Sequence, residues 1–431
     1  MRYLTRWANL SLNNRLENME TRRENFKDSM IGGFTLMIPL VLLSVGATLL
    51  LNIPNNAYLA WLYSGKATLY RNLLMFVYDA IWGNFAFYTV VTVSWCYAKK
   101  IGMSGYQGVM LVISSIIALC ALAGAGTGAF DRATLSNRGM FTAIIALFIS
   151  CFVFLHLTEW SGVTLPRLRV NRMFSASMRH FVPIVCVILI SGLIQAGVSF
   201  VSPGDTLQSL VSRLLTNGVY LVARFSPLLA CLIYGALCMG LWFFGIHGQN
   251  FLYVINDGVY TNFLVENMSS GGDNIVNTAF FNTFCVLGGS GATLALAVAT
   301  LLFCKNKTSR TVSKLEIIPG IFNSSEILSY GLPTVFNKTL IIPFMGLPLL
   351  NAIISYIATY IGLVPIIRHN ISWAMPIFLS GYFATGSIRG SVLQIILFAI
   401  DLAVYIPFAK RYDESIEQSF KSDVKELTGI L

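Results

Sequence analysis

The 431-residue chain contains little charge. Asp, Glu, Lys and Arg make up 11% of it and hydrophobic residues make up 55%, whereas a soluble domain carries roughly 25% charged residues. Uncharged runs of about 20 residues, long enough to cross the hydrocarbon core of a bilayer as a helix, recur along the sequence. A soluble enzyme does not need such runs, and the short alternating strands of a membrane β-barrel are missing. The composition therefore predicts an all-α polytopic membrane protein.

Several chemical motifs are also missing. The eight cysteines form no C-x-x-C pair and have no histidine at zinc spacing, so we expect neither a metal nor another cofactor. The sequence shows no H-E-x-x-H motif, nucleophile elbow or paired catalytic carboxylates, which argues against intramembrane proteolysis and glycoside hydrolysis. The net charge of +10 is spread over loops and termini, so no nucleic-acid surface is predicted.

The apolar runs predict about ten transmembrane helices. The first run is too long for the apolar stretch of a cleaved signal peptide, so we expect it to remain as a helix. The predicted spans are residues 30–51, 73–97, 108–129, 139–158, 181–201, 224–246, 277–304, 339–362, 371–387 and 391–408.

Basic residues at the two ends predict the orientation. Six of the first 29 residues are Arg or Lys, and short basic segments favour the cytoplasmic side, so both termini are expected in the cytoplasm. The opening "MRYLTRWANL" predicts an amphipathic interfacial helix within residues 1–29, with a disordered tail as the alternative. The loop "KNKTSRTVSK" (305–314) has four basic residues, yet the count of crossings places it outside. The sequence therefore does not decide on which side of the membrane this loop lies.

Composition changes near the middle of the chain. No Lys or Arg lies between Arg224 and Lys305, and Gly and Pro interrupt the later apolar runs. Irregular backbone at membrane depth is tolerated only where it is buried in protein or lines a wet cavity, so broken helices indicate a binding site. We therefore predict scaffold helices over residues 30–201 and a domain that holds the binding site over 202–431. The expected re-entrant segments lie near 247–276 and 317–336.

Three motifs in the second half carry candidate site residues. In "LWFFGIHGQN" (241–250), His247 lies between two glycines, whose backbone freedom allows its ring to face a cavity. In "IIPGIFNSSEILSYGLPTVF" (317–336), Glu326 lies near the centre of a predicted hairpin, and an intramembrane carboxylate is expensive enough to indicate function. In "ISWAMPIFLSGYFATG" (371–386), Trp373 suits the apolar face of a sugar ring. Each residue alone also has a structural or interfacial interpretation.

The order of these motifs resembles one family, the membrane-embedded IIC component of the bacterial phosphoenolpyruvate-dependent sugar phosphotransferase system, of the lactose, cellobiose and diacetylchitobiose type. "WFFGIHG" is similar to its histidine motif, "NSSEILSYGLPTVFNKTLIIPFMGLPLLN" to its glutamate hairpin, and "SWAMPIFLSGYFATGSIRGSVLQ" to its last-helices signature. "RRENFKDSMIGGFTLMIPLVLLSVGATLLLNIP" is similar to its first helix. The resemblance covers nearly the whole chain.

The resemblance implies a sugar permease that lies in the bacterial inner membrane in contact with lipid. It also implies a homodimer through the N-terminal helices, with residues 202–431 as the sugar-binding transport domain. It implies that His247 and Glu326 hold the sugar hydroxyl that is phosphorylated and that Trp373 borders the sugar. The phosphoryl group would come from a cysteine of a separate cytoplasmic IIB protein, since no IIB domain is recognised in this chain, and whether the chain itself is an enzyme stays open. The remaining candidate sugar-contact residues, taken from the same motifs, are Trp242, Gln249 and Asn323.

One position departs from the family pattern. The family usually follows its hairpin glutamate with proline, whereas this chain has Ile327, which restores a backbone N–H and frees φ. The resemblance therefore predicts a disaccharide-like ligand but leaves the identity of the sugar open. Two other functions are also open: a proton-coupled secondary sugar transporter, and a regulatory membrane protein of the same fold that does not transport.

Overall fold

The computed structural model describes residues 2–53, 55–103, 105–126, 130–164, 174, 178, 180–269, 271–332, 334 and 337–428. Helices make up nearly all of the secondary structure in these ranges and no strand occurs there, which confirms the all-α prediction. The chain forms two compact units. The first contains Met1–Met37 and Asn84–Leu210, and the second contains Ile38–Gly83 and Val211–Leu431.

The first unit is a bundle of apolar helices. It contains the start of α1 (Arg2–Leu51), α4 (Phe85–Lys100), α5 (Gly105–Leu122), α6 (Met140–Thr164) and α8 (Phe181–Val201). Helices α4, α5, α6 and α8 pack on one another, and Lys100 pairs with Asp28 at 2.7 Å to hold α4 against α1. Helix α8 exposes Leu193 and Phe200. Large apolar side chains on the outside of a helix bundle are stable in lipid but not in water.

Residues 1–29 were predicted to form a separate interfacial segment. The backbone from Arg2 continues without a break into α1, so this segment and the first span form one helix. The side chains of residues 2–20 lie outside the described part of the structure, and the interfacial position stays a prediction.

The second unit contains shorter and more interrupted helices. Residues 38–83 belong to it, although the sequence placed them with the N-terminal helices; the functional roles of the two parts stay predictions. Its helices and helical turns are the end of α1, α2 (Asn56–Leu62), η1 (Gly65–Ala67), α3 (Thr68–Trp82), most of α9 (Leu207–Phe225), α10 (Pro227–Phe243), α11 (Gly248–Phe251), α12 (Tyr253–Ile255), η4 (Asn256–Tyr260), α13 (Thr261–Ser269), α14 (Thr278–Phe280), η5 (Phe281–Cys285), η6 (Ser290–Ala292), α15 (Thr293–Phe303), α16 (Lys307–Ile321), α17 (Glu326–Gly331), α18 (Ile341–Tyr360), α19 (Leu379–Thr385) and α20 (Ile388–Thr428).

The predicted count of ten spans is not confirmed. Among the described residues, seven helices are long and apolar enough to cross a membrane, or up to eight if a bent pair counts as one span. The bent pair corresponds to the predicted span 73–97, which contains the end of α3 and most of α4 with a break between them. The predicted span 371–387 contains only the seven-residue helix α19. Helix α9 was not predicted, because its apolar residues alternate with polar ones.

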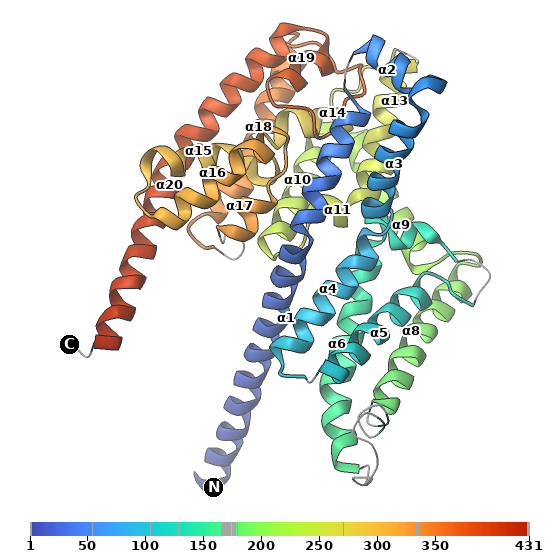
Figure 1. Cartoon of the computed structure of the whole chain (residues 1–431), viewed down its shortest axis with the longest axis vertical. Coiled ribbons are helices and arrows are strands. Elements are labelled where there is room, and N and C mark those ends of the chain that lie inside the picture. The colour runs from blue at the N-terminus through green and yellow to red at the C-terminus, as the bar shows by residue number, and fades with distance from the viewer. Residues whose placement is uncertain are drawn as a thin grey trace. The chain divides into compact units, whose positions relative to one another are not determined.

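The basic segment 305–314 was predicted to be a loop, but from Lys307 onward it forms the first part of α16. The segment begins beside the C-terminal helix α20. Helix α15 packs between α16 and α20 (Figure 1). The N–H groups of Lys305 and Asn306 donate to the carboxylate of Asp413 on α20, at 2.7 and 3.1 Å. The start of this segment therefore lies near the C-terminal end of the candidate span Ile388–Ile416, which is part of α20.

Candidate functional site

The histidine motif is built on the end of α10. This helix ends in a Schellman motif, in which Gly245 (φ +78°) donates its N–H to the Trp242 carbonyl and Ile246 donates to the Leu241 carbonyl. The chain then turns, and His247 is the N-cap residue of α11. The backbone break predicted from the flanking glycines is therefore present, and it takes the histidine out of a regular helix.

His247 and Glu326 meet in the interior of the second unit. Their side chains are 10% and 8% exposed, and Nε2 of His247 lies 3.5 Å from Oε1 of Glu326. Nδ1 of the imidazole accepts the N–H of Asn250 at 3.2 Å. In the neutral imidazole this bond assigns the proton to Nε2. The Nε2–H group therefore faces the carboxylate.

Glu326 is the first residue of α17, outside the helices that are long enough to span a membrane. Its Oε2 accepts a hydrogen bond from Ser324 at 2.5 Å. Burial raises the pKa of Glu326, but the hydrogen bonds from His247 and from the Ser324 hydroxyl outweigh burial and hold the pKa below its ordinary value. The carboxylate is therefore an ionised hydrogen-bond acceptor at neutral pH.

A glycine-rich loop, "GGSG", lies against the tip of the Glu326 hairpin. Gly288 donates its N–H to Oδ1 of Asn323 at 2.9 Å, and Ser290 donates its N–H to Oγ of Ser325 at 3.2 Å. A Cβ atom added at Gly289 would lie 2.7 Å from Cβ of Ser325. The two backbone segments are thus too close for a side chain at this glycine.

The same loop connects Gln249 to the hairpin. Oγ of Ser290 donates to Oε1 of Gln249 at 2.8 Å, while the N–H of Ser290 is bonded to Ser325. A short chain of hydrogen bonds therefore runs from the histidine motif through the glycine loop to the hairpin that carries Glu326.

Asn323 joins three segments through its side-chain amide. Its backbone is left-handed (φ +60°), a conformation that asparagine tolerates better than most residues. Nδ2 donates to the carbonyls of Trp373 and Met375 at 2.9 and 3.1 Å, and Oδ1 accepts from Gly288. The amide is thus bonded to backbone groups, so the structure gives Asn323 the geometry of an orienting residue.

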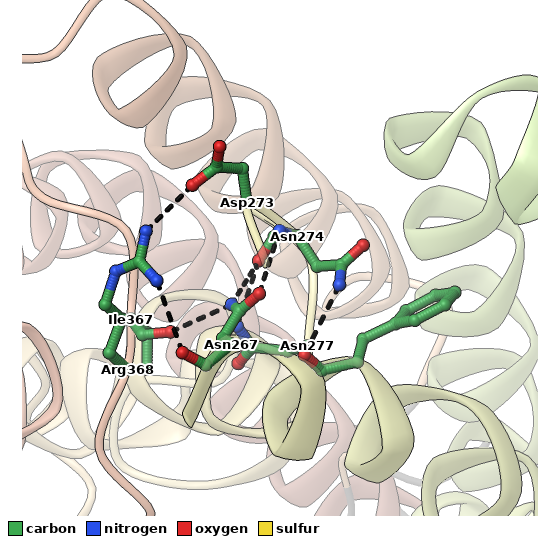
Figure 2. Close-up of polar contacts among 7 residues, drawn as sticks. Asn267, Asp273, Asn274, Asn277, Ile367 and Arg368 are labelled. Carbon is green, nitrogen blue, oxygen red and sulfur yellow. Dashed lines mark hydrogen bonds and ion pairs between the residues drawn. The ribbon is translucent and has the colours of Figure 1, made fainter. Parts of the chain in front are cut away.

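The segment that carries Trp373, residues 361–378, is fixed at its other end by a second polar cluster (Figure 2). Nδ2 of Asn267 donates to the carbonyls of Asn274 and Ile367 at 2.8 and 3.0 Å. Arg368 donates to the carbonyl of Asn267 and pairs with Asp273 at 2.8 Å. Segment 361–378 is therefore held at both ends although it has no regular secondary structure.

The two candidate tryptophans have different surroundings. Trp242 is buried, with its ring centroid 4.5 Å from that of His247, and its Nε1 has no hydrogen-bond partner among the described residues. Trp373 is half-buried, and its ring meets the edge of Trp82 at 6.1 Å. Trp242 thus packs directly on the histidine, whereas Trp373 joins the site through the Asn323 bond.

Sequence reasoning missed several residues around the pair. Glu316, on the helix before the hairpin, is completely buried, and Asn250 is buried with its Nδ2 atom unpartnered among the described residues. Ser324 bonds the carboxylate of Glu326. For Ser324 and Asn250 the available signal was proximity to a candidate residue. For Glu316 the signal was an acidic residue between the basic segment 305–314 and the apolar run that starts at Ile317.

Together, the apolar spans and the buried histidine–carboxylate pair define a polytopic membrane protein whose polar site is built from discontinuous helices. The chain belongs to the EIIC family of the phosphotransferase system: the family model described as "Phosphotransferase system, EIIC" matches residues 31–348. This match confirms the family that the sequence motifs predicted.

The chain is similar to several curated bacterial proteins. It is 29% identical over 295 residues to the PTS system oligo-beta-mannoside-specific EIIC component of Bacillus subtilis (strain 168), covering 67% of this chain and 66% of that protein. It is 30% identical over 294 residues to the lichenan permease IIC component of the same organism, covering 67% and 64%. The chain thus spans just under two thirds of the length of these relatives. It is also 26% identical to the lactose-specific EIICB component of Streptococcus mutans, covering 89% and 68%.

One solved structure has a similar fold. The transporter ChbC, the IIC component of an N,N'-diacetylchitobiose-specific phosphotransferase system, matches with a TM-score of 0.54 and 24% sequence identity, over 96% of this chain and 98% of that chain. At this identity the likeness supports the fold alone.

Proposed function

We propose that this protein is a sugar permease, the IIC component of a phosphoenolpyruvate-dependent phosphotransferase system. The observation that carries the proposal is the 3.5 Å approach of His247 to Glu326, on two separate backbone breaks, in a chain of the EIIC family. Burying an ionisable pair in a membrane protein is costly, so such a pair is expected to have a function.

The pair has complementary chemistry toward a sugar hydroxyl. The Glu326 carboxylate accepts the hydroxyl hydrogen bond and takes its proton, while Nε2–H of His247 donates to the same oxygen. The hydroxyl oxygen then forms a bond to phosphorus as the bond between phosphorus and the cysteine sulfur of a IIB protein breaks. The proton moves to Glu326, and the cysteine leaves as a thiolate.

The proposed cargo is a disaccharide or a glycoside of similar size. Relatives of this chain are named for cellobiose, lactose and oligo-β-mannosides, and aromatic residues lie at the site. The name EIICB of the lactose-specific relatives joins IIC to IIB, which supports a IIB protein as the phosphoryl donor. We place the protein in the bacterial inner membrane.

The proposal is tested by uptake into vesicles that contain this protein. Vesicles loaded with phosphorylated IIB should accumulate a labelled sugar phosphate from a panel of cellobiose, lactose and diacetylchitobiose. Vesicles loaded with unphosphorylated IIB are the control. Accumulation of unmodified sugar driven by a pH gradient would instead favour the proton-coupled transporter, and binding without uptake would favour the regulatory protein.

Replacing Trp373 with Ala is expected to weaken sugar binding by about 1–3 kcal/mol, the scale of a lost aromatic platform. Equilibrium titration with the best sugar of the panel measures the effect. Tyr360→Ala, which removes an exposed aromatic at the end of α18, is the control and should leave affinity unchanged. Wild-type affinity in Trp373→Ala would remove this residue from the site.

Both termini and the basic segment 305–314 are proposed to lie in the cytoplasm. The segment begins beside Asp413 of α20, close to Lys410 and Arg411, and basic segments favour the cytoplasmic side. A cysteine at Lys307 and one at Arg411 should therefore react with a membrane-impermeant maleimide from the same side, in inside-out vesicles and not in intact cells. The eight native cysteines are buried or half-buried, and the unsubstituted protein measures their background. Labelling of the two positions from opposite sides would contradict this orientation.

The protein is further proposed to be a homodimer through its N-terminal helices. These helices are less interrupted than those of the second unit, and the exposed apolar side chains of α8 provide surface for lipid or for a second copy. Cross-linking in bilayers and mass photometry in mild detergent distinguish a dimer from a monomer.

A further inference from the structure

A second carboxyl group, Glu316, lies buried beside the hairpin. Its residue exposure on α16 is 0%, and its Oε2 accepts the N–H of Leu328 at 3.1 Å. Its Oε1 has no hydrogen-bond partner among the described residues. Buried polar groups are normally well satisfied, so a carboxyl in this position requires an explanation.

The explanation lies in the start of α17. The first N–H groups of a helix have no partner within the helix and need acceptors from elsewhere. The N-cap residue Ser325 makes no side-chain bond to α17, because its Oγ accepts the N–H of Ser290 in the glycine loop. Glu316, on the preceding helix, supplies the acceptor that Ser325 does not, for the N–H of the third residue of α17.

The charge state of Glu316 is compatible with this role. Burial and the charge of Glu326 raise the pKa of Glu316 well above its ordinary value, although the Leu328 N–H lowers it. Glu316 lies outside the spanning helices. A neutral carboxyl group does not repel the Glu326 carboxylate, and its carbonyl oxygen still accepts the backbone N–H.

We propose that Glu316 is a positioning residue: by capping α17 from α16, it holds the first turn of that helix and therefore the Glu326 carboxylate within reach of His247. Its effect on the reaction rests on the function proposed above. Its effect on the hairpin does not, and the two are measured separately.

Two substitutions at position 316 separate the hydrogen bond from the volume. Glu316→Gln keeps a neutral side chain with an oxygen that accepts the Leu328 N–H. Glu316→Met has a similar unbranched length but offers no comparable acceptor. Ser313→Ala is the matched control, because Ser313 is also completely buried on α16 and its hydroxyl has no partner among the described residues.

Hydrogen exchange of the purified protein measures the hairpin without any sugar. In Glu316→Met, peptides that cover residues 324–332 should exchange roughly tenfold faster or more, as expected when a buried N–H loses its acceptor. Glu316→Gln and Ser313→Ala should exchange like the wild type. Unchanged exchange in Glu316→Met would overturn the proposal, even if no sugar were transported.

The reaction supplies the second readout. IIB-dependent phosphorylation should fall roughly 10- to 100-fold in Glu316→Met, in line with the loss of a buried hydrogen bond, and should stay near the wild-type rate in Glu316→Gln. In the double variant, Glu316→Met should add almost no further loss of phosphorylation rate to that of Glu326→Gln. A residue that acts through Glu326 has no further effect once that carboxylate is removed. Fully additive losses would show that Glu316 acts elsewhere.

If Glu316→Met does not fold, Glu316→Asp takes its place. Aspartate keeps a carboxyl group but is shorter by one methylene, so it should not reach the Leu328 N–H and should give the same faster exchange and slower phosphorylation. Wild-type behaviour of Glu316→Asp would contradict the proposed contact. A third outcome is also informative: the variants show the expected faster hydrogen exchange, but the wild type phosphorylates no sugar. That result would reject the proposed function and support the capping role of Glu316.

Discussion

Replacing Glu326 with Gln is expected to lower IIB-dependent sugar phosphorylation by about 10²-fold or more, the scale of a lost general base, while part of the sugar binding remains. Gln has nearly the shape of Glu and still accepts a hydrogen bond through its oxygen, but it cannot take the hydroxyl proton. The same 3.5 Å approach to His247 remains available to the amide. Sugar binding by equilibrium titration and sugar phosphate formed with phosphorylated IIB are measured on the same preparation.

His247→Ala provides the contrast to Glu326→Gln. It removes the donor to the hydroxyl, the ring that packs on Trp242 at 4.5 Å and the N-cap of α11, so binding and phosphorylation should both fall. A Glu326→Gln protein that phosphorylates sugar at the wild-type rate would exclude this carboxylate as the base. Equal losses of binding and rate in Glu326→Gln would indicate that the carboxylate only binds the sugar.

Replacing Gly289 with Ala is expected to abolish measurable sugar binding and to lower the melting temperature. Gly289 has φ +98° and ψ −173°, a region that is essentially restricted to glycine, and other residues there lose about 1–3 kcal/mol of stability. The added Cβ would also lie 2.7 Å from Cβ of Ser325, so the glycine loop and the Glu326 hairpin would have to move apart. That movement would break the bonds that Gly288 and Ser290 make to the hairpin.

Gly362→Ala is the matched control for Gly289→Ala. Gly362 also has a positive φ (+76°), but a Cβ there would meet nothing within 4 Å. It should lower stability by roughly 1–2 kcal/mol through backbone strain alone and leave sugar affinity unchanged. If the two variants bound sugar equally well, the close approach of the glycine loop would have no role in shaping the site.

The sequence by itself determined the class of the protein and the position of the backbone break at His247. Low charge and long apolar runs require an all-helical membrane protein, because each backbone polar group in lipid must be satisfied within a helix. Gly245 and Gly248 predicted the break at His247, since glycine ends helices through the left-handed conformation that Gly245 adopts. The motifs around His247, Glu326 and Trp373 also identified the family. The match of the family model to residues 31–348 confirms it.

The tertiary structure decided which residues meet. The count of ten spans is not confirmed because apolarity alone does not distinguish a long continuous helix from the 17-residue helix α10 and the interrupted segment 371–387. The local sequence of the glycine loop before α15 does not predict its contact with the Glu326 hairpin. The closeness of this loop to Ser325 depends on how α15, α16 and α17 pack. Glu316 likewise had no recognisable role until packing brought its carboxyl to the Leu328 N–H. Hydrogen bonds between residues distant in sequence depend on chain packing, which local pattern does not encode.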